Sequence, residues 1–309
     1  MSAGVPEPGR HGGDGARVAA ALGIDRADLL DLSQSLNPFA PDALPIVARH
    51  LDEIGRYPDA GPATAALAAA IGVDPSRVLL TNGGAEAIAL VAAELGRGWV
   101  DEPDFALYRR ALGELDPDGP RFRSNPHNPS GRLAAPTEHA AVWDEAFFPL
   151  ATGRWTRGDV DSIVVGSLTK LLACPGLRLG YVLAPEAEPD LIERLRGRQP
   201  EWAVNGLAAG ALPELLEPVD LPTWSRELTV ARRRLVELLA AHGLAAHPSD
   251  APWVLVTAPG LRAELAPRGV LIRDCASFGM PGVMRIAVPD QPGLDRLDAA
   301  LADISSRSG

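Results

Sequence analysis

Alternating strand-like and helix-like patterns, joined by glycine turns, constrain this chain more than any other feature of its sequence. The apolar run 78–81 predicts a strand, 82–84 a turn and 85–95 a helix. Further apolar runs predict buried strands at 142–143, 162–166 and 179–183. Such alternation is typical of an α/β domain with a mostly parallel sheet.

The pattern changes after residue 205. Helices and strands there are predicted at 207–216, 223–242, 253–257, 283–288 and 292–303. This order indicates a separate α+β unit. We therefore expect three parts, namely an N-terminal arm that packs with the small domain (1–35), a large domain (36–205) and the small domain (206–309).

Composition describes an ordinary globular protein and excludes several classes of partner. The net charge is −11, which argues against nucleic acid, and we expect no metal site. No apolar run reaches the length of a membrane span, and the N-terminus has no stretch like a signal peptide. The two cysteines, Cys174 and Cys275, predict no disulfide framework and fit a reducing cytoplasm.

Lys170 is the one lysine among 29 basic residues, and the rest are arginines. Arginine replaces lysine wherever only positive charge is needed, but its guanidinium stays protonated and cannot act as a nucleophile. Lys170 is therefore a candidate for covalent attachment of an aldehyde cofactor as a Schiff base. A surviving surface lysine is the alternative, and the surrounding SLTK and CPGLRLGY segments favour the chemical role.

A set of special positions, read in order, predicts a site for pyridoxal 5'-phosphate. The phosphate needs N–H donors at a helix start, a hydroxyl and a guanidinium. The pyridine nitrogen needs a carboxylate, and the aldehyde needs an amine. The ring needs a flat side chain to stack on it and a hydrogen-bond donor for its hydroxyl. The candidates in the same order are Gly84, Ala85, Ser167, Arg178, Asp144, Phe105, Asn128 and Lys170.

These residues and the NPHNPSG motif resemble the fold-type I pyridoxal phosphate enzymes. Within them, the chain resembles the branch that holds histidinol-phosphate aminotransferase and threonine-phosphate decarboxylase, from HGG at 11–13 to MRIA at 284–287. The resemblance implies a large, mostly parallel α/β/α cofactor domain and a small α+β domain. It also implies a homodimer in which Tyr57 reaches the cofactor phosphate of the other subunit. Glu86 is counted with the cofactor-contacting set, with capping of its neighbours as the alternative role.

Four segments resemble the decarboxylase side of this branch. They are HGGD, DLSQSLNPFAP, EWAVN, and IRDC together with MRIA. In them the resemblance places His11, Gly12 and Asn37 against the substrate. The last pair supplies Arg273 and Arg285, two arginines suited to a substrate phosphate and carboxylate.

The chain departs from the family pattern at two places. Phe147 stands where aminotransferases of this group carry a tyrosine, and the decarboxylases often have phenylalanine there. The intervals from Phe105 to Asn128 and from Asn128 to Asp144 are short. They leave little room for the helix and strand of the first interval and for the helix of the second.

We therefore expect a cytoplasmic enzyme that decarboxylates an amino-acid phosphate, with threonine phosphate converted to aminopropanol phosphate, a step of cobalamin biosynthesis, as the first choice. Aminotransfer on histidinol phosphate or a related amino acid is the nearest alternative. A protein that binds pyridoxal phosphate with little catalysis is the third.

Overall fold

The structure, a computed structural model, describes residues 4–9, 11–188 and 190–308. Positions 1–3 and 10 of the expected N-terminal arm lie outside the described residues. The chain divides into two compact units. Unit 1 holds the described residues of 1–39, 129–132 and 226–309, and unit 2 holds those of 40–128 and 133–225. Residues 206–225 lie in unit 2, although the sequence suggested the small domain, and the three expected domains stay a prediction.

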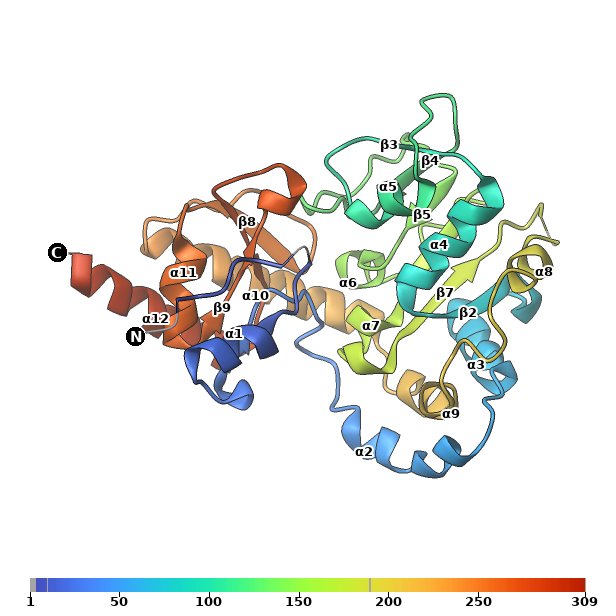
Figure 1. The fold of residues 1–309 in the computed structure, drawn as a ribbon, viewed down its shortest axis with the longest axis horizontal. Coiled ribbons are helices and arrows are strands. Elements are labelled where there is room, and N and C mark those ends of the chain that lie inside the picture. The colour runs from blue at the N-terminus through green and yellow to red at the C-terminus, as the bar shows by residue number, and fades with distance from the viewer. Residues whose placement is uncertain (1–3, 10, 189, 309) are drawn as a thin grey trace. The chain divides into compact units, whose positions relative to one another are not determined.

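A six-stranded mixed sheet forms the centre of unit 2 (Figure 1). Its spatial order is β2-β7-β6-β5-β4-β3. The strands are β2 (Val78–Asn82), β3 (Trp99–Val100), β4 (Arg121–Ser124), β5 (Val142–Asp144), β6 (Ile163–Ser167) and β7 (Leu179–Leu183). Strands β3 to β6 pair in parallel, and β7 pairs antiparallel with both β6 and β2. Five strands therefore run in one direction and β7 alone in the other, which confirms the mostly parallel sheet.

Helices and apolar strands make the core of unit 2. The helices are α2 (Leu44–Ala48), α3 (Gly61–Ile71), α4 (Gly83–Leu95), α5 (Ala106–Leu112), α6 (Phe148–Thr152), α7 (Leu168–Leu171), α8 (Leu191–Arg196) and α9 (Gly206–Leu216). Helix α4 packs across β2, β6 and β7, and α8 packs on α4. Apolar side chains of α4, such as Ile88 and Val91, are buried against strand residues such as Val165 and Val182. The continuous apolar runs of these strands follow from burial on both faces.

Unit 1 is an α+β arrangement with two small sheets. Strand β1 (Leu30–Asp31) pairs in parallel with β9 (Val270–Leu271). Strands β10 (Arg273–Asp274), β11 (Val283–Ala287) and β8 (Trp253–Thr257) form the second, antiparallel sheet in that order. The helices are α1 (Gly15–Leu22), α11 (Leu261–Leu265) and α12 (Gln291–Ser308), together with most of α10 (Leu221–Ala241).

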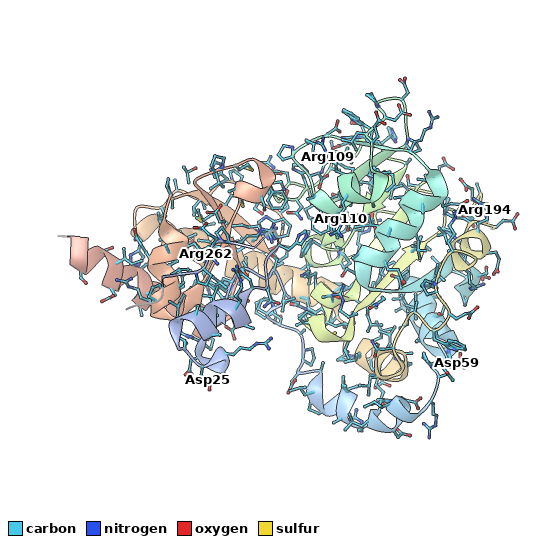
Figure 2. The ribbon with its side chains drawn as sticks, viewed as in Figure 1. Asp25, Asp59, Arg109, Arg110, Arg194 and Arg262 are labelled. Atoms are coloured by element: carbon cyan, nitrogen blue, oxygen red, sulfur yellow. The ribbon has the colours of Figure 1, made fainter. Side chains whose placement is uncertain are left out.

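The N-terminal arm is held to the rest of unit 1 by a buried arginine. Arg262, labelled in Figure 2, donates to the Pro6 carbonyl and to Asp14 Oδ2 at 2.8 and 3.2 Å. Asp14 Oδ2 also accepts the N–H of Gly9 at 3.3 Å. The arm therefore depends on a charged, largely buried contact as well as on the β1–β9 pairing.

The shortened stretch between Asn128 and Asp144 keeps no helix among its residues, as the short interval predicted. The stretch from Phe105 to Asn128 does hold a helix and a strand, α5 and β4, although its short length had suggested little room for them. Arginine side chains secure the irregular segment. Arg157 donates to the carbonyls of Ala135, Pro136 and Glu138 at 2.8–3.1 Å, and Arg121 and Arg123 both bond Glu138 Oε1. The Arg157 bonds satisfy backbone carbonyls that a helix would have satisfied internally, and the other two bonds fix the Glu138 side chain.

Within the described part of the chain, no helix combines the length and the apolar character needed to cross a membrane.

Candidate active site in unit 2

Every residue predicted to contact the cofactor lies in unit 2, and all but Tyr57 lie at or after the carboxyl ends of strands or precede β7. Strands β2, β3, β4, β5 and β6 run in one direction, so their carboxyl ends share one edge of the sheet. Because β7 runs the other way, Arg178 at its start reaches the same edge. Ligands of open α/β sheets bind at this edge. The residues at the strand ends are Asp144 and Ser167, and those that follow strand ends are Gly84, Ala85, Glu86, Phe105, Asn128 and Lys170.

The start of α4 forms a cradle suited to a phosphate. Gly83 has a φ of +77°, and an added Cβ would lie 2.4 Å from Arg178 Nη2, so only glycine lets the guanidinium approach. An added Cβ on Gly84 would lie 3.4 Å from Ser167 Cβ. The helix N-terminus, a hydroxyl and a guanidinium therefore meet, as the chemistry of phosphate binding requires.

Glu86 caps the helix that carries this cradle. Its Oε2 accepts the N–H of Asn82 at 2.7 Å and the amide of Gln199 at 3.0 Å. The glutamate lies in the first turn and accepts the N–H of the N-cap residue, so it satisfies a backbone donor at the helix start. This is the alternative role considered for Glu86, and its contact with the cofactor stays a prediction.

Lys170 lies on the short helix α7, directly after β6 ends at Ser167. The segment from there to β7 contains two non-glycine residues with left-handed backbone, Ala173 at φ 50° and Arg178 at φ 59°. Such residues cost about 1–3 kcal/mol each and gather at functional sites. Asn205, from the EWAVN segment, donates to the Leu177 carbonyl at 2.8 Å and so holds this loop beside Arg178.

Asp144 ends β5 and is buried, as expected of a partner for a ring nitrogen. Its Oδ2 accepts the hydroxyl of Tyr108 at 2.7 Å, and its Oδ1 accepts the N–H of Ala146 at 2.9 Å. Burial raises the pKa of Asp144 to about 6, while the Tyr108 hydrogen bond lowers it and the charge of Asp104 raises it. The two hydrogen bonds favour the ionised carboxylate against the cost of burial, and an ionised carboxylate suits a protonated pyridine nitrogen.

Phe105 and Asn128 are held by residues that the sequence did not single out. The Phe105 N–H donates to Asp104 Oδ1 at 2.7 Å, and the Asn128 N–H donates to Ser124 Oγ at 2.8 Å. Asp104, Ser124 and Tyr108 are all buried. The one sequence signal for Asp104 was its place just before a helix, where aspartate often stands.

Tyr57 lies outside the strands and helices, with 78% of its surface exposed. Its ring stacks on Trp202, with 4.4 Å between centroids. Leu44, Leu51 and Ile54 are exposed in the same stretch of chain, so large apolar side chains gather there. The expected crossing of Tyr57 into another subunit stays a prediction.

The residues predicted to bind substrate lie in unit 1, and the structure brings two of them together. Arg273 and Arg285 are register partners on β10 and β11, and both are buried, with 7% and 5% of their surface exposed. They lie over the rings of Phe278 and Trp253 at 4.8 and 4.9 Å. Burial and the charge of Arg273 lower the pKa of Arg285 to about 9. A pair of buried guanidinium groups on adjacent strands favours binding of an anionic ligand.

Of the other three predicted substrate residues, His11 and Gly12 belong to the N-terminal arm and Asn37 follows it. Gly12 approaches the Ser33 carbonyl so closely that an added Cβ would lie 2.2 Å away. The next residue, Gly13, donates its N–H to Ser33 Oγ at 2.9 Å. This bond holds the segment that contains His11 against the loop at Ser33. Asn37 is buried, and its Oδ1 accepts the Phe39 N–H at 3.0 Å. Their contacts with a substrate stay a prediction.

Comparison with known proteins agrees with this geometry. The family model for aminotransferase class I and II matches residues 122–301. The threonine-phosphate decarboxylase of Salmonella typhimurium is 31% identical, and the match covers 95% of this chain and 96% of that protein. That alignment spans 356 positions, more than the 309 of this chain, so the relative carries segments that are missing here.

Two further similarities point to the same branch. Histidinol-phosphate aminotransferase 2 of Pseudomonas aeruginosa is 29% identical, with 93% of this chain and 92% of that protein covered. The solved L-threonine-O-3-phosphate decarboxylase of Porphyromonas gingivalis superposes with a TM-score of 0.74 at 25% identity, covering 88% of this chain and 98% of that chain. The chain therefore belongs to the aminotransferase class I and II family of fold-type I enzymes, whose cofactor is pyridoxal 5'-phosphate.

Proposed function

We propose that this protein decarboxylates an amino-acid phosphate, with L-threonine O-3-phosphate as substrate and aminopropanol phosphate as product. The observation that carries the proposal is the buried pair Arg273 and Arg285, which face each other in register on adjacent strands. Two planar guanidinium groups suit a substrate with both a phosphate and a carboxylate. Phe147 and the 31% identity to a threonine-phosphate decarboxylase support the same choice.

The residues at the sheet edge fit the cofactor. Lys170 would supply the amine that binds its aldehyde, and the α4 N-terminus, Ser167 and Arg178 would supply donors for its phosphate. Asp144 would hold a proton on the pyridine nitrogen through its buried carboxylate, whose ionised form is favoured by the hydrogen bonds from Tyr108 and Ala146. When bound, pyridoxal phosphate supplies an electron sink for the bond that breaks at the substrate α-carbon. In decarboxylation that bond joins the α-carbon to the carboxylate, carbon dioxide leaves, and a proton takes its place.

Aminotransfer on histidinol phosphate is the second candidate. It is favoured by the 29% identity to a histidinol-phosphate aminotransferase over 93% of this chain. A pyridoxal phosphate protein with little catalysis is the third, since the chain lacks segments that its relatives carry. In aminotransfer the α-carbon loses a proton, and the amino group passes to a keto acid without release of carbon dioxide. Product analysis therefore distinguishes decarboxylation, aminotransfer and binding with little catalysis.

Product analysis tests the proposal. The purified protein with threonine phosphate should release carbon dioxide and aminopropanol phosphate, without need of 2-oxoglutarate. Arg273→Ala should weaken binding of threonine phosphate by about 30-fold to several thousand-fold, the loss typical of a desolvated charged contact. Arg268→Ala, which removes an arginine bonded to Asp303 in the same unit, is the matched control and should have little effect.

Two results would count against decarboxylation. Equal binding of threonine and threonine phosphate would show that the protein has no pocket for the substrate phosphate. Turnover that requires 2-oxoglutarate and releases no carbon dioxide would favour the aminotransferase.

A further inference from the structure

Three buried residues outside the predicted cofactor set supply a network of supporting hydrogen bonds at the sheet edge. Tyr108 lies on α5, Ser124 ends β4, and Asp104 precedes α5. Asp104 accepts the hydroxyl of Ser124 at Oδ1 and its N–H at Oδ2, the latter at 3.1 Å. Tyr108 is 1% exposed and its ring packs edge-on against Phe105, with 5.8 Å between centroids.

Each member of this network bonds directly to one of the residues predicted to face the cofactor ring. Asp104 accepts the Phe105 N–H, and Ser124 Oγ accepts the Asn128 N–H. Tyr108 donates its hydroxyl to Asp144 Oδ2. The ring partner, the ring-hydroxyl donor and the carboxylate therefore come from three strand ends but share one set of supports. Hydrogen bonds from supporting residues fix the side-chain rotamers of the residues that face a cofactor or substrate.

The network also controls the charge of Asp144. A buried carboxylate is costly, and its ionised form is favoured by each hydrogen bond that it accepts. Of the groups that act on Asp144, the Tyr108 hydroxyl lowers its pKa and the Asp104 carboxylate raises it. Glu145 and Tyr181 are the other buried titratable groups nearby, and burial raises the pKa of both. Removing the Tyr108 hydroxyl should raise the pKa of Asp144 further, by roughly one unit.

We propose that Asp104, Ser124 and Tyr108 are positioning residues that hold Phe105, Asn128 and Asp144 in place for the cofactor ring. This inference rests on the proposed placement of pyridoxal phosphate at Asp144 and Lys170. Through Tyr108 the network keeps the Asp144 carboxylate oriented and ionised, so that the shared proton stays on the pyridine nitrogen. Through Asp104 and Ser124 it ties the start of α5 to the end of β4.

The test compares Tyr108→Phe with Tyr181→Phe. Both variants lose one buried tyrosine hydroxyl in the same unit, but the Tyr181 ring packs on Gly166 and is not part of the network. Two quantities are measured without substrate, namely the dissociation constant of pyridoxal phosphate and the pH midpoint of its absorption band. Tyr108→Phe should weaken cofactor binding by about tenfold, the effect of one charge-assisted hydrogen bond. Tyr181→Phe should leave it within about twofold.

The pH midpoint should move upward in Tyr108→Phe. A more basic Asp144 draws the shared proton toward itself, which leaves less positive charge on the pyridine nitrogen. The nitrogen of Lys170 then keeps its own proton to a higher pH, because the positive charge opposing it is weaker. A purely structural role for Tyr108 would lower stability and leave this midpoint where it is.

Ser124→Ala carries the test independently, in case Tyr108→Phe does not fold. It removes the support of Asn128 and the hydroxyl bonded to Asp104, and should also weaken cofactor binding. If both network variants match Tyr181→Phe in affinity and midpoint, the positioning role is wrong. If the unaltered protein does not bind pyridoxal phosphate through Lys170, the proposed function fails instead, so the two failures are distinguishable.

Discussion

Replacing Asp144 with asparagine should stabilise the cofactor-free protein at neutral pH while removing most of its activity. Burial raises the pKa of Asp144 to about 6 in the folded chain, from an ordinary value of 3.8. The folded chain therefore holds the Asp144 proton more tightly than the unfolded chain does. The free energy of unfolding falls as the pH rises from about 4 to about 6, and this loss is constant above that range.

The magnitude follows from the size of the shift. About two pKa units correspond to about 3 kcal/mol. Asparagine has the same shape as aspartate, so its Oδ1 can still accept the Ala146 N–H and its amide can donate to Tyr108. Because asparagine has no charge, its burial does not carry the cost of removing a carboxylate from water. Asp144→Asn should therefore exceed the stability of the unaltered protein by up to about 3 kcal/mol near pH 7.5, with the difference vanishing near pH 4.

Urea unfolding of the cofactor-free protein, followed by circular dichroism at several pH values, measures this difference. Asp161→Asn, which changes an exposed aspartate of the same unit, is the control and should show no such trend. A stability difference that does not vary with pH would refute the reasoning, as would a variant less stable than the unaltered protein at pH 7.5. With cofactor added, activity should fall by about 10²–10⁴-fold, the loss typical of a proton-placing group. Activity within threefold of the unaltered protein would mean that Asp144 is not the pyridine partner.

Two further predictions concern the covalent anchor and the assembly. Borohydride should fix pyridoxal phosphate to Lys170, and Lys170→Ala should lose the reducible band, since the chain has no other lysine; a band that persisted would contradict the assignment. The protein should sediment as a homodimer at micromolar concentration, and Ile54→Glu, which places a charge among the exposed apolar side chains beside Tyr57, should shift it toward monomer. An unaltered protein that is monomeric with its cofactor fully bound would remove this claim.

Local patterns in the sequence were enough to predict most elements of the fold. The strand, glycine turn and helix over 78–95 became β2 and α4, because apolar runs and Gly83 act within a few residues. The pairing of Arg273 with Arg285 was also foreseeable, since a glycine-containing turn between two short strands brings their residues opposite each other.

The supports of the site could not be predicted in the same way. Tyr108 and Asp144 are 36 positions apart, and Asp104 and Ser124 are 20 apart, so their contacts depend on which strands are neighbours. The direction of β7 was equally hidden. Its residues are buried along the whole strand, and an apolar run of this kind reads the same in a parallel and an antiparallel sheet.

That reversed strand has a consequence for how much of the domain can be lost. Because β6 and β7 are antiparallel neighbours, a single short connection carries both Lys170 and Arg178 to the same edge of the sheet. The covalent anchor and the ionic anchor proposed for the cofactor are thus only eight residues apart in the chain. The connection between β4 and β5, on the other side of β6, contributes neither of them. We therefore expect that a chain built this way can lose the helix of that connection and still bind the cofactor. The hydrogen bonds from Arg157 to the backbone carbonyls of the remaining loop hold that loop in place without a helix.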